Sequence, residues 1–98
     1  MRPLQKLARG QPCLVRIPGV CNGNPETTVL AHIRRQNVGG MGLKPPDLIG
    51  AWACSDCHDV IDGRQKSPYN STDIARFEAE GLVRTLYEVD RLVTVKVN

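Results

Sequence analysis

The stretch Cys54-Ser-Asp-Cys57-His58 decides how the rest of this 98-residue chain is interpreted. Two cysteines separated by two residues can turn their sulfurs toward one metal ion, which is the spacing of a zinc knuckle. The chain has two further cysteines, Cys13 and Cys21, and both lie upstream. Four thiolates complete the tetrahedral shell that zinc prefers and leave no position for water. The sequence therefore predicts a structural zinc site formed by Cys13, Cys21, Cys54 and Cys57.

Seven residues separate Cys13 from Cys21, which is more than the two to four residues that are usual between paired zinc ligands. The turn residues Pro18 and Gly19 lie in this interval and can fold the chain so that both sulfurs reach one ion. Two alternatives stay open. His58 could replace one cysteine as a ligand, or the four thiols could bind no metal.

A metal would supply stability that the composition does not. Only 41% of the residues are hydrophobic, and the aromatic residues are one Phe, one Trp and two Tyr. A single domain over residues 1–98 therefore has a small core, to which a bound metal adds folding free energy. Because the chain has no long apolar run and no leader-like stretch, we expect a cytoplasmic protein without a membrane partner. In that reducing compartment, cysteines at this spacing are metal ligands more often than disulfides.

Positive charge is concentrated in the first half of the chain. Residues 1–44 carry seven basic residues and one acidic residue, whereas residues 45–98 carry six basic and nine acidic residues. A basic segment is expected where a protein contacts a polyanion such as DNA. A basic surface that only aids solubility is the alternative. Residues 1–12 are predicted to form a basic N-terminal arm or a short helix.

The hydrophobic pattern predicts strands and helices within one small domain. Short extended segments are predicted at residues 13–17, 27–33 and 48–53. The last of these runs directly into Cys54. A helix is then expected to begin at Ser55 or Asp56, either of which can cap it, and to end near Gly63.

A longer helix is predicted to begin near Ser71, because apolar residues recur at intervals near 3.6, at Ile74, Phe77, Gly81, Leu82, Leu86 and Val89. Gly81 lies inside this pattern and weakens the helix propensity there. The valines of residues 93–97 alternate with polar residues, which predicts a C-terminal strand. As an exposed edge, such a strand would allow a homodimer through residues 92–97.

The two histidines and Asp62 form a second group of interest. His32 ends an extended segment and is followed closely by Arg34 and Arg35. His58 and Asp62 are four residues apart, so they lie on one face of the predicted helix, and such a pair suits Mg²⁺ or Mn²⁺. Phosphodiester hydrolysis needs a general base, a cation on the phosphate oxygens and basic side chains that hold the strand. His32 can provide the base, His58 and Asp62 can hold the cation, and Arg34 and Arg35 can hold the strand.

Each of these groups also has a simpler explanation. His32 can be a structural histidine that is hydrogen-bonded at a strand end. His58 and Asp62 can be an ordinary pair on a helix surface. Asp56 and Asp59 are explained as negative charges near a helix N-terminus.

The order of a strand ending in His, a loop, a strand, a Cys-x-x-Cys-His motif and a helix resembles the HNH or His-Me finger nucleases, the ββα-metal group. The resemblance implies that the four cysteines hold a structural zinc and that His32 is the general base. It implies that His58 binds the catalytic Mg²⁺ or Mn²⁺, with Asp62 where many members have a second metal-binding His. DNA cleavage in this group leaves 5′-phosphate and 3′-hydroxyl ends.

Most of residues 5–90 also resembles the YbcO family, small proteins of lambdoid phages and prophages that are named as nucleases. The stretches that carry this likeness are residues 15–26, 30–34, 44–48 and 53–59. Two positions depart from the HNH pattern. Ala31 stands where many members have a metal ligand directly before the base, and the Asn that orients the base has its nearest counterpart in Asp47.

Together these features predict an α+β fold, a small zinc-stabilised ββα-metal domain with an added C-terminal helix and terminal strand. The expected function is that of a metal-dependent DNA endonuclease in which Arg34, Arg35 and Lys44 contact the nucleic acid. The alternative belongs to a different class: a non-catalytic zinc module that binds DNA or a phage recombination partner through its basic N-terminal part.

Overall fold

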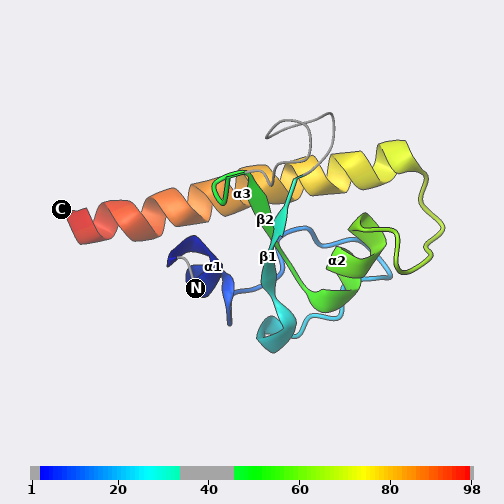
Figure 1. The fold of residues 1–98 in the computed structure, drawn as a ribbon, viewed down its shortest axis with the longest axis horizontal. Helices are drawn as coiled ribbons and strands as arrows, with labels where there is room; N and C mark the ends of the chain where they lie inside the picture. Colours follow the sequence, from blue (N-terminus) through cyan, green and yellow to red (C-terminus); the bar gives the residue numbers. More distant parts are fainter. Residues whose placement is uncertain (1–2, 34–45, 98) are drawn as a thin grey trace.

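The computed structural model of the chain describes residues 3–33 and 46–97. Its elements follow one another as α1 (Pro3–Ala8), the short 3-10 helix η1 (Pro25–Thr27), β1 (Val29–His32), β2 (Gly50–Ala53), α2 (Ser55–Ile61) and α3 (Ser71–Val97). Helix α3 runs along the length of the molecule, and the two strands lie against its middle with α1 and α2 to either side (Figure 1). The described residues thus form a small α+β structure, as expected.

The sheet consists of β1 and β2, which pair antiparallel with Leu30 opposite Trp52 and Ala31 opposite Ala51. Since neighbouring side chains on a strand point to opposite faces, the two faces differ in size. One face carries Ala31, Ala51 and Ala53, and the other carries Leu30 and Trp52. All four residues of β2 are buried, so this short strand lies at the centre of the structure.

Each face of the sheet has its own group of buried side chains. The alanine face contributes to a cluster with the cysteines and with residues of α2 and α3, namely Cys13, Val15, Ile17, Cys54, Cys57, Val60 and Phe77. Trp52 packs on the other side with Ala8 and Leu14, flanked by the partly buried Leu7, Leu30, Val89 and Leu92. The small alanine side chains leave room for the sulfurs, whereas the large indole fills the space beneath α1 and α3.

The outer edge of β2 is closed by hydrogen bonds rather than by a third strand. The Trp52 amide donates to the Thr85 hydroxyl on α3 at 2.9 Å. The Trp52 carbonyl accepts from the amides of Leu14 at 2.8 Å and Val15 at 3.3 Å. In addition, Arg84 Nη1 donates to the Leu14 carbonyl at 2.7 Å. These bonds satisfy backbone groups that would otherwise be buried without partners, and they attach α3 to the sheet.

Several sequence predictions are confirmed. The segments at 27–33 and 48–53 contain β1 and β2, and the helix expected from Ser55 begins there and ends at Ile61. The short helix expected within residues 1–12 is present as α1, which packs against β1 with Ala8 completely buried. Along the part of the chain that is described, no helix has both the length and the apolar character needed to cross a membrane.

The strand predicted at residues 13–17 is wrong. The segment bends, because Arg16 has a φ of 54°, a left-handed conformation that no extended strand contains. This bend brings the Arg16 amide to 3.5 Å from Cys13 Sγ. The position of the sulfur therefore outweighs the β-branched composition that suggested a strand.

The predicted C-terminal strand is also wrong, since α3 is helical without interruption from Ser71 to Val97. Alternating valines express only a weak preference, and extending an existing helix costs much less than starting a new element. The proposed homodimer through residues 92–97 depended on an edge strand and loses its basis. Gly81 likewise lies inside the continuous helix.

Gly81 has a packing function that can be tested. A Cβ at this position would lie 2.7 Å from Val15 Cγ2 and 3.0 Å from Val15 Cα. Gly81→Ala should therefore lower the free energy of unfolding by about 1–3 kcal/mol through overpacking, although Ala is the better helix former by about 1 kcal/mol. Urea denaturation followed by circular dichroism measures the change, and a stabilised variant would contradict this close approach.

Candidate metal centre and active site

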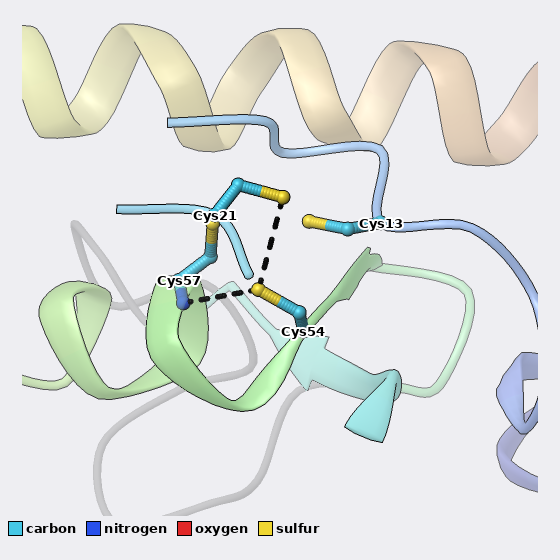
Figure 2. Close-up of side chains that lie close together, drawn as sticks. All are labelled: Cys13, Cys21, Cys54 and Cys57. Carbon is cyan, nitrogen blue, oxygen red and sulfur yellow. Dashed lines mark hydrogen bonds between the residues drawn. The ribbon is translucent and has the colours of Figure 1, made fainter. Parts of the chain in front are cut away.

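The four cysteine sulfurs converge on one point. All four Sγ atoms lie within 4.8 Å of one another, although the residues come from three separate segments (Figure 2). Cys54 caps the N-terminus of α2 and Cys57 lies in its first turn, whereas Cys13 and Cys21 flank the bend before η1. Three of the cysteines are buried, Cys21 is half-buried, and all four are free thiols. Sulfurs at these separations can surround a single tetrahedral metal ion.

Backbone amides are directed at these sulfurs. The amide of Cys57 donates to Cys54 Sγ at 3.4 Å, and that of Asn22 donates to the same sulfur at 3.5 Å. The amide of Arg16 is directed at Cys13 Sγ. Such donors favour the thiolate over the thiol. The bends that provide them are therefore part of the sulfur site.

The cysteine sulfurs share protons with one another. Donation from the Cys57 thiol lowers the pKa of Cys13 to about 4, and the same contact raises the pKa of Cys57. Burial raises the pKa of Cys21 to about 11. Four thiolates at these separations would repel one another, and a bound divalent ion would offset that repulsion by taking the place of the protons. This donor set fits zinc, in agreement with the sequence prediction of a four-cysteine site.

Loss of one sulfur should remove the metal and unfold the domain. We expect Cys54→Ser to lower the zinc content from about one ion per chain to nearly none, because an open three-sulfur shell binds zinc far more weakly. Elemental analysis and far-UV circular dichroism measure zinc and folding. The adjacent variant Ser55→Ala is the control and should keep its zinc. Equal zinc content in Cys54→Ser and wild type would exclude this set of ligands.

A buried contact between a histidine and a carboxylate lies at the end of the sheet away from the cysteines. His32 Nε2 is 2.8 Å from Asp47 Oδ1, and the two side chains are only 6% and 9% exposed. His32 ends β1, and the Asp47 turn is closed by a hydrogen bond from the Ile49 amide to the Pro46 carbonyl. The Ile33 amide donates to the Ile49 carbonyl at 2.9 Å, which extends the strand pairing and places the turn beside His32.

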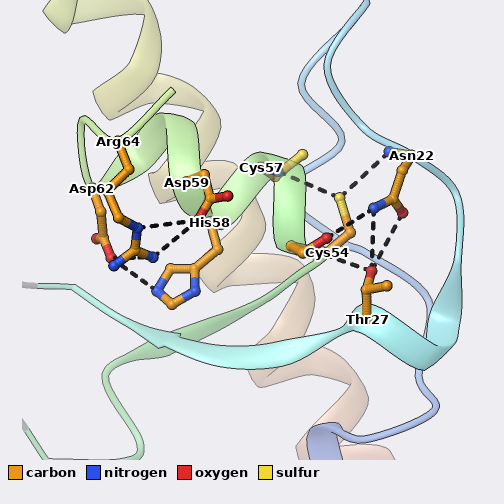
Figure 3. A network of polar contacts seen from close by, with 9 residues as sticks. Asn22, Thr27, Cys54, Cys57, His58, Asp59, Asp62 and Arg64 are labelled. Atoms are coloured by element: carbon orange, nitrogen blue, oxygen red, sulfur yellow. Dashed lines mark hydrogen bonds and ion pairs between the residues drawn. The ribbon is translucent and has the colours of Figure 1, made fainter. Parts of the chain in front are cut away.

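The other histidine lies on α2. His58 Nε2 is 3.1 Å from Asp62 Oδ2, and these side chains are about a third exposed. Arg64 Nη2 contacts the same Asp62 oxygen at 3.1 Å and Asp59 Oδ1 at 3.0 Å. Figure 3 shows this group at the C-terminal end of α2, away from the cysteines at its start. The pairing of His58 with Asp62 agrees with the helical spacing in the sequence.

Comparison with known proteins agrees with the resemblance to the YbcO family. The model of a family described as "Putative nuclease YbcO" matches residues 2–93. The chain belongs to the YbcO family. Proteins named "Putative nuclease YbcO" from Escherichia coli (strain K12) and Enterobacteria phage 82 are each 67% identical to it over 64 residues, which is 65% of this chain and 67% of theirs.

A solved structure of the same fold is also known. It is described as a putative bacteriophage protein from Escherichia coli str. K-12, and it superposes with a TM-score of 0.71 and 48% identity over 92% of this chain and 98% of that chain. The fold of this YbcO-family member is thus supported independently of its sequence pattern.

Other residues of the expected site divide into two groups. Arg34, Arg35 and Lys44 lie outside the described residues. Ala31 is 1% exposed and belongs to the buried alanine face, so a side chain at this position faces the core. A metal ligand at this position would therefore point into the core of the chain.

Arg64, which lies beside the His58–Asp62 pair, was not identified from the sequence. Arg64 follows the end of α2, and its contacts with Asp59 and Asp62 cross the helix terminus. The sequence signal was Gly63, which ends the helix and allows the next residue to fold back toward the preceding turn. Asp59, interpreted from sequence as a helix charge, is part of this group.

Proposed function

We propose that this YbcO-family chain is a metal-dependent DNA endonuclease of the HNH or His-Me finger type, a zinc-stabilised ββα-metal domain. The observation that carries the proposal is the buried pair of His32 and Asp47, 2.8 Å apart. A histidine held by a carboxylate is a recurring arrangement for a general base. The curated relatives are named as nucleases, which supports the same class of reaction.

The element order supports this assignment. Antiparallel β1 and β2 are followed directly by α2, which contacts β1. The sulfur site is at the junction of β2 and α2, so its zinc would have a structural function and fix the helix against the strands. His32 on β1 and His58 on α2 would then face the same substrate from two elements of one domain spanning residues 1–98.

The contact with Asp47 assigns a chemical function to each ring nitrogen of His32. Because Nε2 donates its proton to the carboxylate, Nδ1 is the ring atom that can accept a proton. In the proposed step, Nδ1 takes a proton from water as the water oxygen bonds to phosphorus. The bond from phosphorus to the 3′ oxygen breaks, and the 3′ oxygen takes a proton from a second water molecule, which yields 5′-phosphate and 3′-hydroxyl ends. Asp47 stabilises the imidazolium that results.

His58 and Asp62 would hold the catalytic Mg²⁺ or Mn²⁺. Their ligand atoms lie 3.1 Å apart and about a third of each side chain is exposed, so an imidazole nitrogen and a carboxylate oxygen can reach one ion from solvent. When bound, such a cation offsets negative charge on the phosphate and on the leaving oxygen.

The partner in this proposal is DNA, bound through the basic N-terminal half. Arg34, Arg35 and Lys44 belong to the segment of residues 1–44 that has seven basic residues and one acidic residue. Cations on this segment would contact phosphates, so the affinity should fall as salt is raised. The cytoplasm of a host that carries the phage or prophage would be the place of action.

The first test concerns the base. His32→Ala should reduce plasmid cleavage with Mg²⁺ or Mn²⁺ by about 10²- to 10⁴-fold, the usual contribution of a general base, while zinc content and DNA binding stay near wild type. Single-turnover cleavage and a filter-binding assay measure the two properties. Equal cleavage by both proteins would exclude His32 from the mechanism. DNA binding without cleavage in either protein would favour the non-catalytic zinc module.

The second test concerns the carboxylate. Asp47→Ala removes the group that holds His32 Nε2, so the cleavage rate should fall by about tenfold or more. Because Asp47 acts through His32, DNA affinity should change little. Asp73→Ala, in the first turn of α3, is the matched control and should cleave like wild type. A parallel loss of affinity and rate would indicate that Asp47 has a structural function only.

A further inference from the structure

The backbone at the end of α2 holds Arg64 in a defined position. Asp62 is the C-cap of the helix, and Gly63 follows with a φ of 80°. The Gly63 amide donates to the Val60 carbonyl at 3.2 Å, and the Arg64 amide donates to the Asp59 carbonyl at 2.9 Å. This pair of bonds is a Schellman motif, in which glycine is favoured because its φ is positive. Arg64 therefore folds back over the last turn of the helix.

The side chain of Arg64 then joins two carboxylates. Its Nε is 3.1 Å from Asp59 Oδ1, and its Nη2 lies 3.0 Å from that same oxygen. Nη2 is also 3.1 Å from Asp62 Oδ2, the oxygen that contacts His58 Nε2 at 3.1 Å. Figure 3 shows the guanidinium between the two carboxylates and beside the His58 ring.

These contacts put Arg64 in competition with an added cation. A Mg²⁺ or Mn²⁺ bound by His58 and Asp62 would need the Asp62 oxygen at roughly 2.1 Å, and the guanidinium already contacts that oxygen. Two positive groups at one carboxylate also repel each other. The Arg64 side chain can move away from Asp62 at low cost, because 59% of it is exposed and exposed ion pairs are weak.

We propose that Arg64 is an internal cation that occupies the Asp59 and Asp62 carboxylates in the metal-free protein and sets the affinity of the His58–Asp62 pair for a divalent ion. This inference rests on the cation site of the proposed function. Metal binding displaces the guanidinium from Asp62. The arginine thereby offsets part of the negative charge of the two carboxylates until the divalent ion is present at sufficient concentration.

Mn²⁺ binding to the zinc-loaded full chain, followed by electron paramagnetic resonance without DNA, tests the proposal. Arg64→Gln removes the charge and should tighten Mn²⁺ binding by roughly three- to tenfold, the range for exposed ion pairs that no longer compete. Arg91→Gln is the matched control, because Arg91 is 57% exposed and pairs with Glu88 on α3. It changes the net charge equally and should bind Mn²⁺ like wild type.

Displacement can be observed directly by a second measurement. The Nε–H resonance of Arg64 should shift on titration with diamagnetic Mg²⁺, and this shift should be absent in His58→Ala. Equal Mn²⁺ affinity in wild type and Arg64→Gln, with binding lost in His58→Ala, would overturn the function of Arg64 but leave the cation site intact. Absence of His58-dependent Mn²⁺ binding in every variant would overturn both.

Discussion

The convergence of four sulfurs from three separate segments is the constraint on which the rest of the structure depends. Thiolates within 4.8 Å of one another repel, so their proximity requires a cation or shared protons. The conformation near the sulfurs follows from that requirement. The left-handed backbone at Arg16 and the cap of α2 by Cys54 direct amides at the sulfurs. The small alanine side chains on one face of the sheet leave room for the sulfurs.

The same constraint aligns α2, and α2 aligns the groups with potential chemistry. Because Cys54 and Cys57 fix the first turn of the helix, His58 emerges next to them and Asp62 follows one turn later. The glycine that ends the helix then returns Arg64 to the same surface. The four-cysteine cluster and the group formed by His58, Asp59, Asp62 and Arg64 therefore lie at the two ends of one short helix.

The parts of the fold that could be predicted from sequence are those determined by local spacing. The Cys-x-x-Cys pair, the helix after it and the i, i+4 relation of His58 and Asp62 need only helix geometry. Residues 13–17 and the C-terminal tail were mispredicted, because a sulfur contact at Cys13 and the extension of α3 outweigh local β preference. The pairing of His32 with Asp47 depends on a turn that returns along the sheet, and residue spacing gives only a weak indication of it.

Trp52 is the only tryptophan of the chain, and its position has a practical consequence. It is 1% exposed, belongs to the face of the sheet opposite the alanines, and donates its amide to α3. Its intrinsic fluorescence thus reports the docking of the long helix on the side of the sheet away from the sulfurs. Combined with the rate at which thiol-reactive probes label the cysteines, this fluorescence distinguishes the opening of the two halves of the core, so the order in which they unfold can be followed without any substitution in the chain.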